Sequence, residues 1–175
     1  MRDQETAQIG MRAAMTGHLV FSTLHTNDAL STPIRLVDMG VPRYMVATSL
    51  QAVIAQRLIR VVCENCSTEY QPLPNEMEWL ALDLGERAAQ HKYYHGRGCN
   101  SCNGTGYQGR RGVYEMLEMN AEVLDAINHH DQVHFLKVAR QHMGEHTLRR
   151  HAMSLVLAGK TTVGEAMRIS NVTDD

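Results

Sequence analysis

Two Cys-x-x-Cys pairs constrain this chain more than any other feature of its sequence: Cys63 with Cys66, and Cys99 with Cys102. Two residues between cysteines let one tight turn present both thiolates to the same ion. Two such pairs complete the tetrahedral four-sulfur site that suits zinc. The segment between the pairs, Ser67 to Gly98, is longer than the roughly 15 to 20 residues of common zinc ribbons, so it must fold back as a small subdomain. With sulfur at all four positions the ion has no open site, and its predicted role is structural.

Four unrelated free thiols, or a redox pair, are the alternatives to a metal site. No cysteine lies outside the two pairs, which favours the metal. The sequence has no stretch near the roughly 20 apolar residues that cross a bilayer. Residues 1–10 also lack the apolar centre of a secretory signal. We therefore expect a reducing cytoplasmic location, where thiolates persist and disulfides are rare.

Composition excludes one further class of partner. The 175 residues are 43% hydrophobic, enough for one domain or two small ones with a true core. Seventeen Lys+Arg against nineteen Asp+Glu give a formal net charge of −2. Because no excess of positive charge can neutralise a phosphate backbone, nucleic-acid binding is not expected.

The residue composition and periodicity of the sequence change twice, which predicts three segments. Residues 1–62 alternate helical and strand patterns, residues 63–110 are rich in cysteine, glycine and tyrosine, and residues 111–175 are mostly helical after an initial strand. The alternation in the first segment is typical of a layered α/β domain. We therefore predict an α/β core followed by a cysteine-bearing subdomain and a helical subdomain.

Within the first segment the elements are predicted from caps and periodicity. Asp3 caps a helix over residues 4–15, and the apolar, β-branched run 18–24 reads as a buried strand. A second helix follows, in which Pro33 requires a late start or a kink because proline disrupts a helix interior. A third helix is predicted over residues 43–58.

Two motif-like runs in the last segment lack the context that their chemistry needs. Gly159-Lys160 resembles the end of a phosphate-binding loop, but Ser154 stands where the motif requires glycine, and the preceding residues read as helix. The run from His142 to His146 fits an inverted zinc-protease pattern, yet Gly144 predicts a break in the helix that would have to carry both histidines.

Histidines bracket the predicted strand over residues 18–24. His18 is its first residue and His25 follows it, next to the predicted start of a helix. In open α/β sheets ligands bind at the carboxyl ends of strands, and helix N-terminal amides there favour an anionic group such as phosphate. A histidine after a strand is more often a structural residue. The pattern alone leaves both roles open.

Seven runs of sequence carry a family resemblance, and they follow one another in the family's order: residues 1–7, 16–29, 38–41, 55–58, 98–110, 144–148 and 157–168. Through them the chain resembles, from end to end, the ATPases that power type II secretion and type IV pilus assembly. This resemblance implies the C-terminal part of a RecA-like P-loop ATPase domain with an inserted tetracysteine zinc subdomain and a helical C-terminal subdomain.

The resemblance also implies roles for single residues. Residues 16–28 correspond to the family's histidine box, with His18 and His25 as its catalytic histidines and His25 nearest the γ-phosphate of ATP. Arg2 and Asp3 match the tail of the Walker B motif. Cys63, Cys66, Cys99 and Cys102 match the family's structural zinc site.

The family's Walker A loop, acidic box and Walker B glutamate have no counterpart in the sequence. By the resemblance they precede Met1, which is either a native start or an internal residue. We therefore expect this chain to be the C-terminal portion of a longer ATPase and to be inactive alone. By the resemblance, the complete protein is a cytoplasmic homo-hexamer that binds ATP and Mg²⁺. It acts on an inner-membrane platform protein. The four cysteines are similar to those of the assembly branch, which includes the ATPases of mannose-sensitive haemagglutinin pili.

Two other classes remain as alternatives. A free-standing zinc-stabilised interaction module would share the four cysteines but would not require a histidine-box segment at the start of the chain. A fragment of a related nucleic-acid motor would require salt-dependent DNA binding, which the slightly acidic charge balance disfavours.

Overall fold

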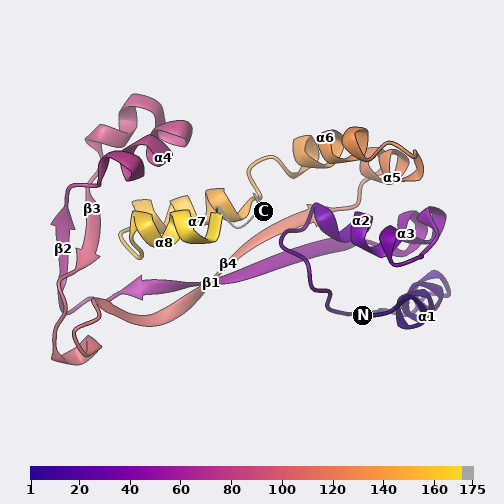
Figure 1. Ribbon diagram of the computed structural model, residues 1–175, viewed down its shortest axis with the longest axis horizontal. Helices are drawn as coiled ribbons and strands as arrows, with labels where there is room; N and C mark the ends of the chain where they lie inside the picture. The colour runs from indigo at the N-terminus through magenta and orange to yellow at the C-terminus, as the bar shows by residue number, and fades with distance from the viewer. Residues whose placement is uncertain (171–175) are drawn as a thin grey trace. The chain divides into compact units, whose positions relative to one another are not determined.

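The computed structural model describes residues 1–170 and shows a mixed α/β protein (Figure 1). Its residues pack into two compact units, each discontinuous in sequence. Unit 1 comprises Met1–Ala55 and Glu115–Thr147, and unit 2 comprises Gln56–Tyr114 together with the described residues from Leu148 onward. Each unit has its own hydrophobic core.

Unit 1 is helical around a core of small and medium apolar side chains. Its helices are α1 (Gln4–Met15), α2 (Ser31–Asp38), α3 (Arg43–Ser49), α5 (Ala121–Asn128) and α6 (Gln132–Met143). Helix α3 packs against α1, α2 and α5, and α5 packs against α6. Fully buried residues at the centre of this core are Ala7, Leu36, Val46, Val123 and Phe135.

Unit 2 combines a small antiparallel ribbon with helices. The ribbon pairs β2 (Ser67–Tyr70) with β3 (Tyr93–Gly96). The remaining elements are α4 (Pro74–Leu84), the 3₁₀ helices η1 (Gly85–Gln90) and η2 (Asn100–Cys102), α7 (Leu148–Leu157) and α8 (Val163–Ser170). Helix α8 packs against α7 and α4, and the buried side chains between them include Leu80, Val156 and Val163.

Two long strands, β1 (Ala52–Val62) and β4 (Tyr107–Glu118), pair with each other. Each strand supplies residues to both units. Along β4 the side chains alternate strictly from Val113 onward, so that Val113, Glu115 and Leu117 are buried while the residues between them are exposed. This is the period of two that a half-buried strand requires.

Several local expectations are confirmed. Asp3 caps α1, because its carboxylate accepts a hydrogen bond from the Thr6 amide at 2.8 Å. Helix α2 starts late and holds Pro33 in its first turn, where a missing amide hydrogen costs little. The helix break at Gly144 is also present: α6 ends at Met143, and Gly144 has a positive φ of 50°.

The predicted strand over residues 18–24 does not form. The segment has no regular secondary structure, and Leu19 and Phe21 are 84% and 87% exposed. An apolar strand is stable only when neighbouring strands take up its backbone hydrogen bonds. Among the described residues, the sheets are the β1–β4 and β2–β3 pairs, and neither includes this segment.

The predicted helix over residues 43–58 is wrong in its second half. Helix α3 ends at Ser49, Leu50 is extended, and β1 begins at Ala52. Ile54, which the helical pattern would bury, is 63% exposed. The region from Val53 to Val62 is rich in β-branched residues, which favour strands over helices. The strand propensity prevails because β4 is present as a partner.

A buried carboxylate on α8 binds an arginine of β1, which in turn contacts β4. Glu165 is 3% exposed and binds the Arg60 guanidinium at 2.6 Å and the Arg168 guanidinium at 3.2 Å. Arg60 also lies over the Tyr107 ring, 4.2 Å from its centroid. The Thr162 hydroxyl oxygen accepts a hydrogen bond from the Glu165 amide, as an N-terminal cap should. Burial opposes ionisation of Glu165, but the hydrogen bonds from Arg60 and Arg168 outweigh it and lower its pKa to about 2.

We predict that Glu165→Gln destabilises the protein by about 1–3 kcal/mol at pH 7, because the Arg60 and Arg168 contacts lose their buried anionic partner. The folded-state pKa lies below the ordinary value of 4.5, so the stabilisation is complete above that value and is lost as the pH falls toward 2. Urea unfolding of wild type and variant at pH 7, 4 and 2 measures the difference.

Glu86→Gln is the matched control, since Glu86 is exposed on η1 in the same unit. It should leave the unfolding midpoint nearly unchanged at each pH. An unfolding difference for Glu165→Gln that stays the same from pH 7 to pH 2 would contradict the assignment of this stabilisation to the ionised carboxylate.

Candidate functional site

The antiparallel pairing of β2 with β3 brings the two cysteine pairs together. Ser67, at the start of β2, lies opposite Gly96, at the end of β3. Cys63 and Cys66 come directly before β2, and the second pair follows β3, so both pairs meet at the same end of the ribbon. The amide of Arg97 donates a hydrogen bond to the Cys66 carbonyl oxygen at 3.1 Å and fixes this end.

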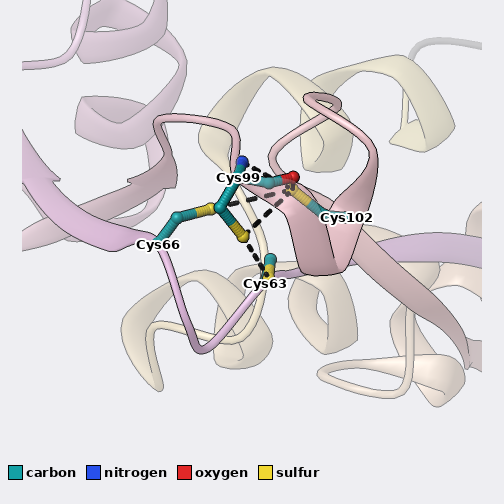
Figure 2. Close-up of side chains that lie close together, drawn as sticks. All are labelled: Cys63, Cys66, Cys99 and Cys102. Atoms are coloured by element: carbon teal, nitrogen blue, oxygen red, sulfur yellow. Dashed lines mark hydrogen bonds between the residues drawn. The ribbon is translucent and has the colours of Figure 1, made fainter.

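The four sulfur atoms point toward one another (Figure 2) and all lie within 4.8 Å. The Sγ–Sγ distances are 3.9 Å for Cys63–Cys99, 3.8 Å for Cys66–Cys102 and 3.7 Å for Cys99–Cys102. A metal ion at the zinc–thiolate distance of about 2.3 Å, in a regular tetrahedron, separates its sulfur ligands by about 3.8 Å. All four cysteines are free, so the cluster is not a pair of disulfides. Its dimensions fit one tetrahedral ion.

Hydrogen bonds from backbone amides favour the thiolate form of Cys102. The amides of Cys99 and Gly106 donate to Cys102 Sγ at 3.2 and 3.3 Å. Burial opposes ionisation of Cys102, but these amides lower the pKa of its thiol to about 6. Burial, reinforced by the neighbouring thiols, raises the pKa of Cys66 to about 11. Cys102 therefore ionises more readily than Cys66, and a bound cation would favour the ionised form of all four ligands.

Glycines let the chain pass closely over itself beside the cluster. A Cβ on Gly96 would collide with the backbone of Gly106, and one on Gly106 would collide with the backbone of Gly96. Gly106 also has a φ of 76°, which side chains other than glycine rarely adopt. The Gly106 carbonyl oxygen accepts a hydrogen bond from the Cys63 amide at 3.0 Å. The cysteine-bearing loops are thus held by their backbones, and four inward sulfurs leave no position for a substrate.

The predicted histidines lie in unit 1, in the segment between α1 and α2. We call residues 16–28 the histidine segment. His18 is held near the end of α1, with its Nδ1 3.2 Å from both the Thr16 hydroxyl oxygen and the Ala13 carbonyl oxygen. His25 is exposed near the other end of the segment. Asp3, expected in the tail of a Walker B motif, serves here as the cap of α1.

The two motif-like runs at Gly159-Lys160 and His142–His146 do not form the sites that their patterns suggest. Gly159 has a φ of 66° just after α7, so it ends a helix and does not open a phosphate-binding loop. His142 belongs to α6, whereas His146 follows the break at Gly144, so one helix does not carry both. The Nδ1 atom of His142 instead lies 3.0 Å from the side-chain Nδ2 atom of Asn120.

Sequence reasoning missed a buried contact of the histidine segment. The amide of Ala29, just after the segment, donates to Glu115 Oε1 on β4 at 2.6 Å. Glu115 is only 6% exposed. The signal was present in the sequence, because strand alternation places Glu115 on the same face as Val113 and Leu117. A carboxylate on an apolar face calls for a polar partner.

Comparison with known proteins identifies the class. The family model described as Type II/IV secretion system protein matches residues 1–168. The chain therefore belongs to this family of secretion and pilus ATPases.

Individual relatives agree with this membership. The type II secretion system protein E of Dickeya dadantii is 42% identical over 172 residues, covering 97% of this chain and 33% of the relative. The type IV pilus assembly ATPase PilB of Thermus thermophilus is 40% identical over 167 residues, covering 95% of this chain and 19% of the relative. The chain thus spans a third or less of the length of these relatives.

The fold also matches a solved structure. The crystal structure of the pilus retraction motor PilT with bound ADP aligns over 98% of this chain and 38% of that chain, with a TM-score of 0.63 and 27% identity. The expected mixed α/β architecture of a secretion ATPase is confirmed at this level. Among residues 1–170, no helix is both long and apolar enough to cross a membrane.

We predict that the cysteine cluster binds one divalent metal ion per chain. Co²⁺ added to metal-free protein should produce a thiolate charge-transfer absorption that saturates at one equivalent. Replacing any one of the four cysteines with serine should weaken binding by about 100-fold or more, because a sulfur ligand is lost.

Ser101→Ala provides the control, since Ser101 is exposed between two of the cysteines. Its titration should match that of the wild type. If all four thiols react as freely in the native protein as in urea, and no metal copurifies, the cluster is not a metal site.

Proposed function

We propose that this chain is the C-terminal portion of a hexameric cytoplasmic ATPase that powers type IV pilus assembly or type II secretion. The main support is the family match over residues 1–168, together with about 40% identity to relatives from both systems. The four cysteines favour an assembly or secretion motor, and the ATPases of mannose-sensitive haemagglutinin pili remain our proposal for the system.

The three segments would divide the work of this portion. Residues 1–62 would complete the RecA-like core and carry the histidine segment, with His25 acting on the γ-phosphate side of ATP and His18 supporting it. Residues 63–110 would form the zinc subdomain, and residues 111–175 a helical subdomain behind the nucleotide. Support for the first role comes from the exposure of His25, which leaves its ring accessible to a ligand.

Zinc is our proposal for the ion in the cysteine cluster. Four sulfur donors at tetrahedral spacing suit its preference for soft ligands and four-coordination. Zinc there would be a structural crosslink that holds the start of β2 to the end of β3. Because the ligands gather only in the folded chain, removal of the metal would loosen this subdomain first.

Hydrolysis requires parts that these 175 residues lack. Phosphoryl transfer depends on a phosphate-binding loop with its lysine, on Mg²⁺ held at the phosphates, and on a residue that orients the attacking water. The sequence contains no G-x-x-x-x-G-K-[ST] pattern. We therefore propose that ATP and Mg²⁺ bind only in a longer protein and that this portion alone does not turn over ATP.

The complete protein would convert hydrolysis into movements of domains around a homo-hexameric ring. An inner-membrane platform protein would receive these movements, so the ATPase would be peripheral to the membrane through its partners. Nucleic acid is not a proposed partner, since the net charge of −2 offers no surplus of cations.

ATP turnover tests the proposal. The 175-residue chain should show no Mg²⁺-dependent hydrolysis, whereas a longer version that restores the upstream sequence should hydrolyse ATP. In that longer protein, His25→Ala should lower kcat by roughly 10- to 1,000-fold, because a group that acts on the transferring phosphoryl is removed.

His130→Ala is the control for the histidine variant, as His130 is exposed and lies outside the histidine segment. It should leave turnover unchanged. Hydrolysis by the 175-residue chain alone would overturn the proposal. A longer protein without any ATPase activity would favour the free-standing zinc module instead.

A further inference from the structure

The histidine segment is long, irregular and largely exposed, so something must fix its geometry. Local bonds order its end nearest α2. The Thr26 and Thr32 hydroxyls lie 2.8 Å apart, and the Asp28 carboxylate accepts a hydrogen bond from the Ser31 amide at 2.6 Å. These contacts tie the segment to the first turn of α2. Nearer the middle of the segment, the Met1 ammonium donates to the Ser22 hydroxyl at 3.2 Å, but these contacts do not link the end of the segment to β4.

Glu115 supplies that second tie. Its carboxylate accepts the Ala29 amide hydrogen at 2.6 Å, across 86 positions of sequence. Ala29 is fully buried and Glu115 nearly so. A short bond between an amide and a carboxylate, shielded from water, is stronger than an exposed neutral one. The end of the histidine segment is thereby held against β4.

Burial makes this contact specific. Val113 and Leu117 flank Glu115 on the buried face of β4, and both are fully buried. An ionised side chain at such a position is costly unless hydrogen bonds compensate it. Glutamate is a poor choice for packing alone, and a valine or leucine would fill the strand face without that cost. Its presence at this buried position therefore requires a polar partner, and the structure provides one in the Ala29 amide.

The contact lies close enough to His25 to control its position. His25 and Ala29 are four positions apart in the sequence, which limits their Cα–Cα distance to at most about 14 Å. The neighbouring Thr26 is itself bonded to Thr32. On this side of His25, only the peptide that joins it to Thr26 is therefore left without a restraint. Catalytic groups must be held within about 0.5 Å of their productive position, and a loop reaches such precision only when its ends are fixed.

We propose that Glu115 is a positioning residue for His25. By holding the Ala29 amide, it fixes where the histidine segment enters α2 and so where the His25 ring can reach. Glu115 is buried, so it would act on His25 through the backbone of Ala29. This inference rests on the proposed function of His25, but the hydrogen bond can be tested without ATP.

Amide hydrogen exchange on the 175-residue chain tests the contact directly. In Glu115→Ala, exchange of the Ala29 amide should accelerate about 10- to 100-fold, the worth of a hydrogen bond to a charged acceptor. Amides of residues 25–28 should follow, while those of α1 and α6 keep their wild-type rates. Glu115→Gln keeps an acceptor oxygen and should lie between the two. Glu118→Gln, an exposed carboxylate on the same strand, should match the wild type.

Kinetics of a longer, ATP-hydrolysing version test the consequence. Glu115→Ala should lower kcat about as much as His25→Ala, with a smaller change in KM for ATP. Glu115→Gln should restore part of kcat, and the double variant should be no worse than His25→Ala alone.

Two results would overturn the proposal: Ala29 exchange that is unchanged in Glu115→Ala or that accelerates equally throughout unit 1, and a wild-type kcat in Glu115→Ala where His25→Ala is impaired. If His25→Ala itself leaves kcat unchanged, the proposed function of His25 fails, while the exchange measurement still decides whether Glu115 holds the segment.

Discussion

The pairing of β1 with β4 is the constraint on which the rest of the structure depends. These strands are separated by the whole cysteine-bearing region in sequence, yet both units draw core residues from them. Ile59 and Val113 belong to the core of unit 2, and Leu117 belongs to the core of unit 1. The cysteine-bearing loop leaves from the end of β1, and the chain returns into β4 beside Gly106. A one-residue change in the register of this pair would move Glu115 off the buried face of β4.

Both candidate sites depend on buried polar groups that are satisfied by partners distant in sequence. In the cysteine cluster the Cys63 amide donates to the Gly106 carbonyl oxygen, and beside the histidine segment Glu115 accepts the Ala29 amide hydrogen; outside the two sites, Glu165 binds Arg60 in the same way. A buried polar group without such a partner costs free energy, so each contact favours one arrangement of its loops over all others. These few contacts fix the positions of the loops. Aromatic side chains, which could also hold loops in place by packing, make up only 5% of the residues.

The sequence predicted best where structure is local. The cap at Asp3, the late start of α2 at Pro33 and the break at Gly144 follow from side-chain chemistry within a few residues, and all three are present. It predicted worst where a segment depends on its neighbours. Residues 52–58 suit a helix or a strand by apolar content alone, and β4 decides for the strand. Residues 18–24 have strand propensity, but no described strand pairs with them, and they remain irregular.

By itself the sequence determined the cysteine spacing, the order of motifs that marks a secretion ATPase, the cap of α1 and the break after α6, because these properties lie within short stretches of chain. Only the tertiary structure decided that four sulfurs meet at tetrahedral spacing and that Glu115 holds the end of the histidine segment. Both depend on contacts between residues dozens of positions apart. Such contacts are selected by the balance of burial and hydrogen bonding over a whole unit, which no local pattern encodes.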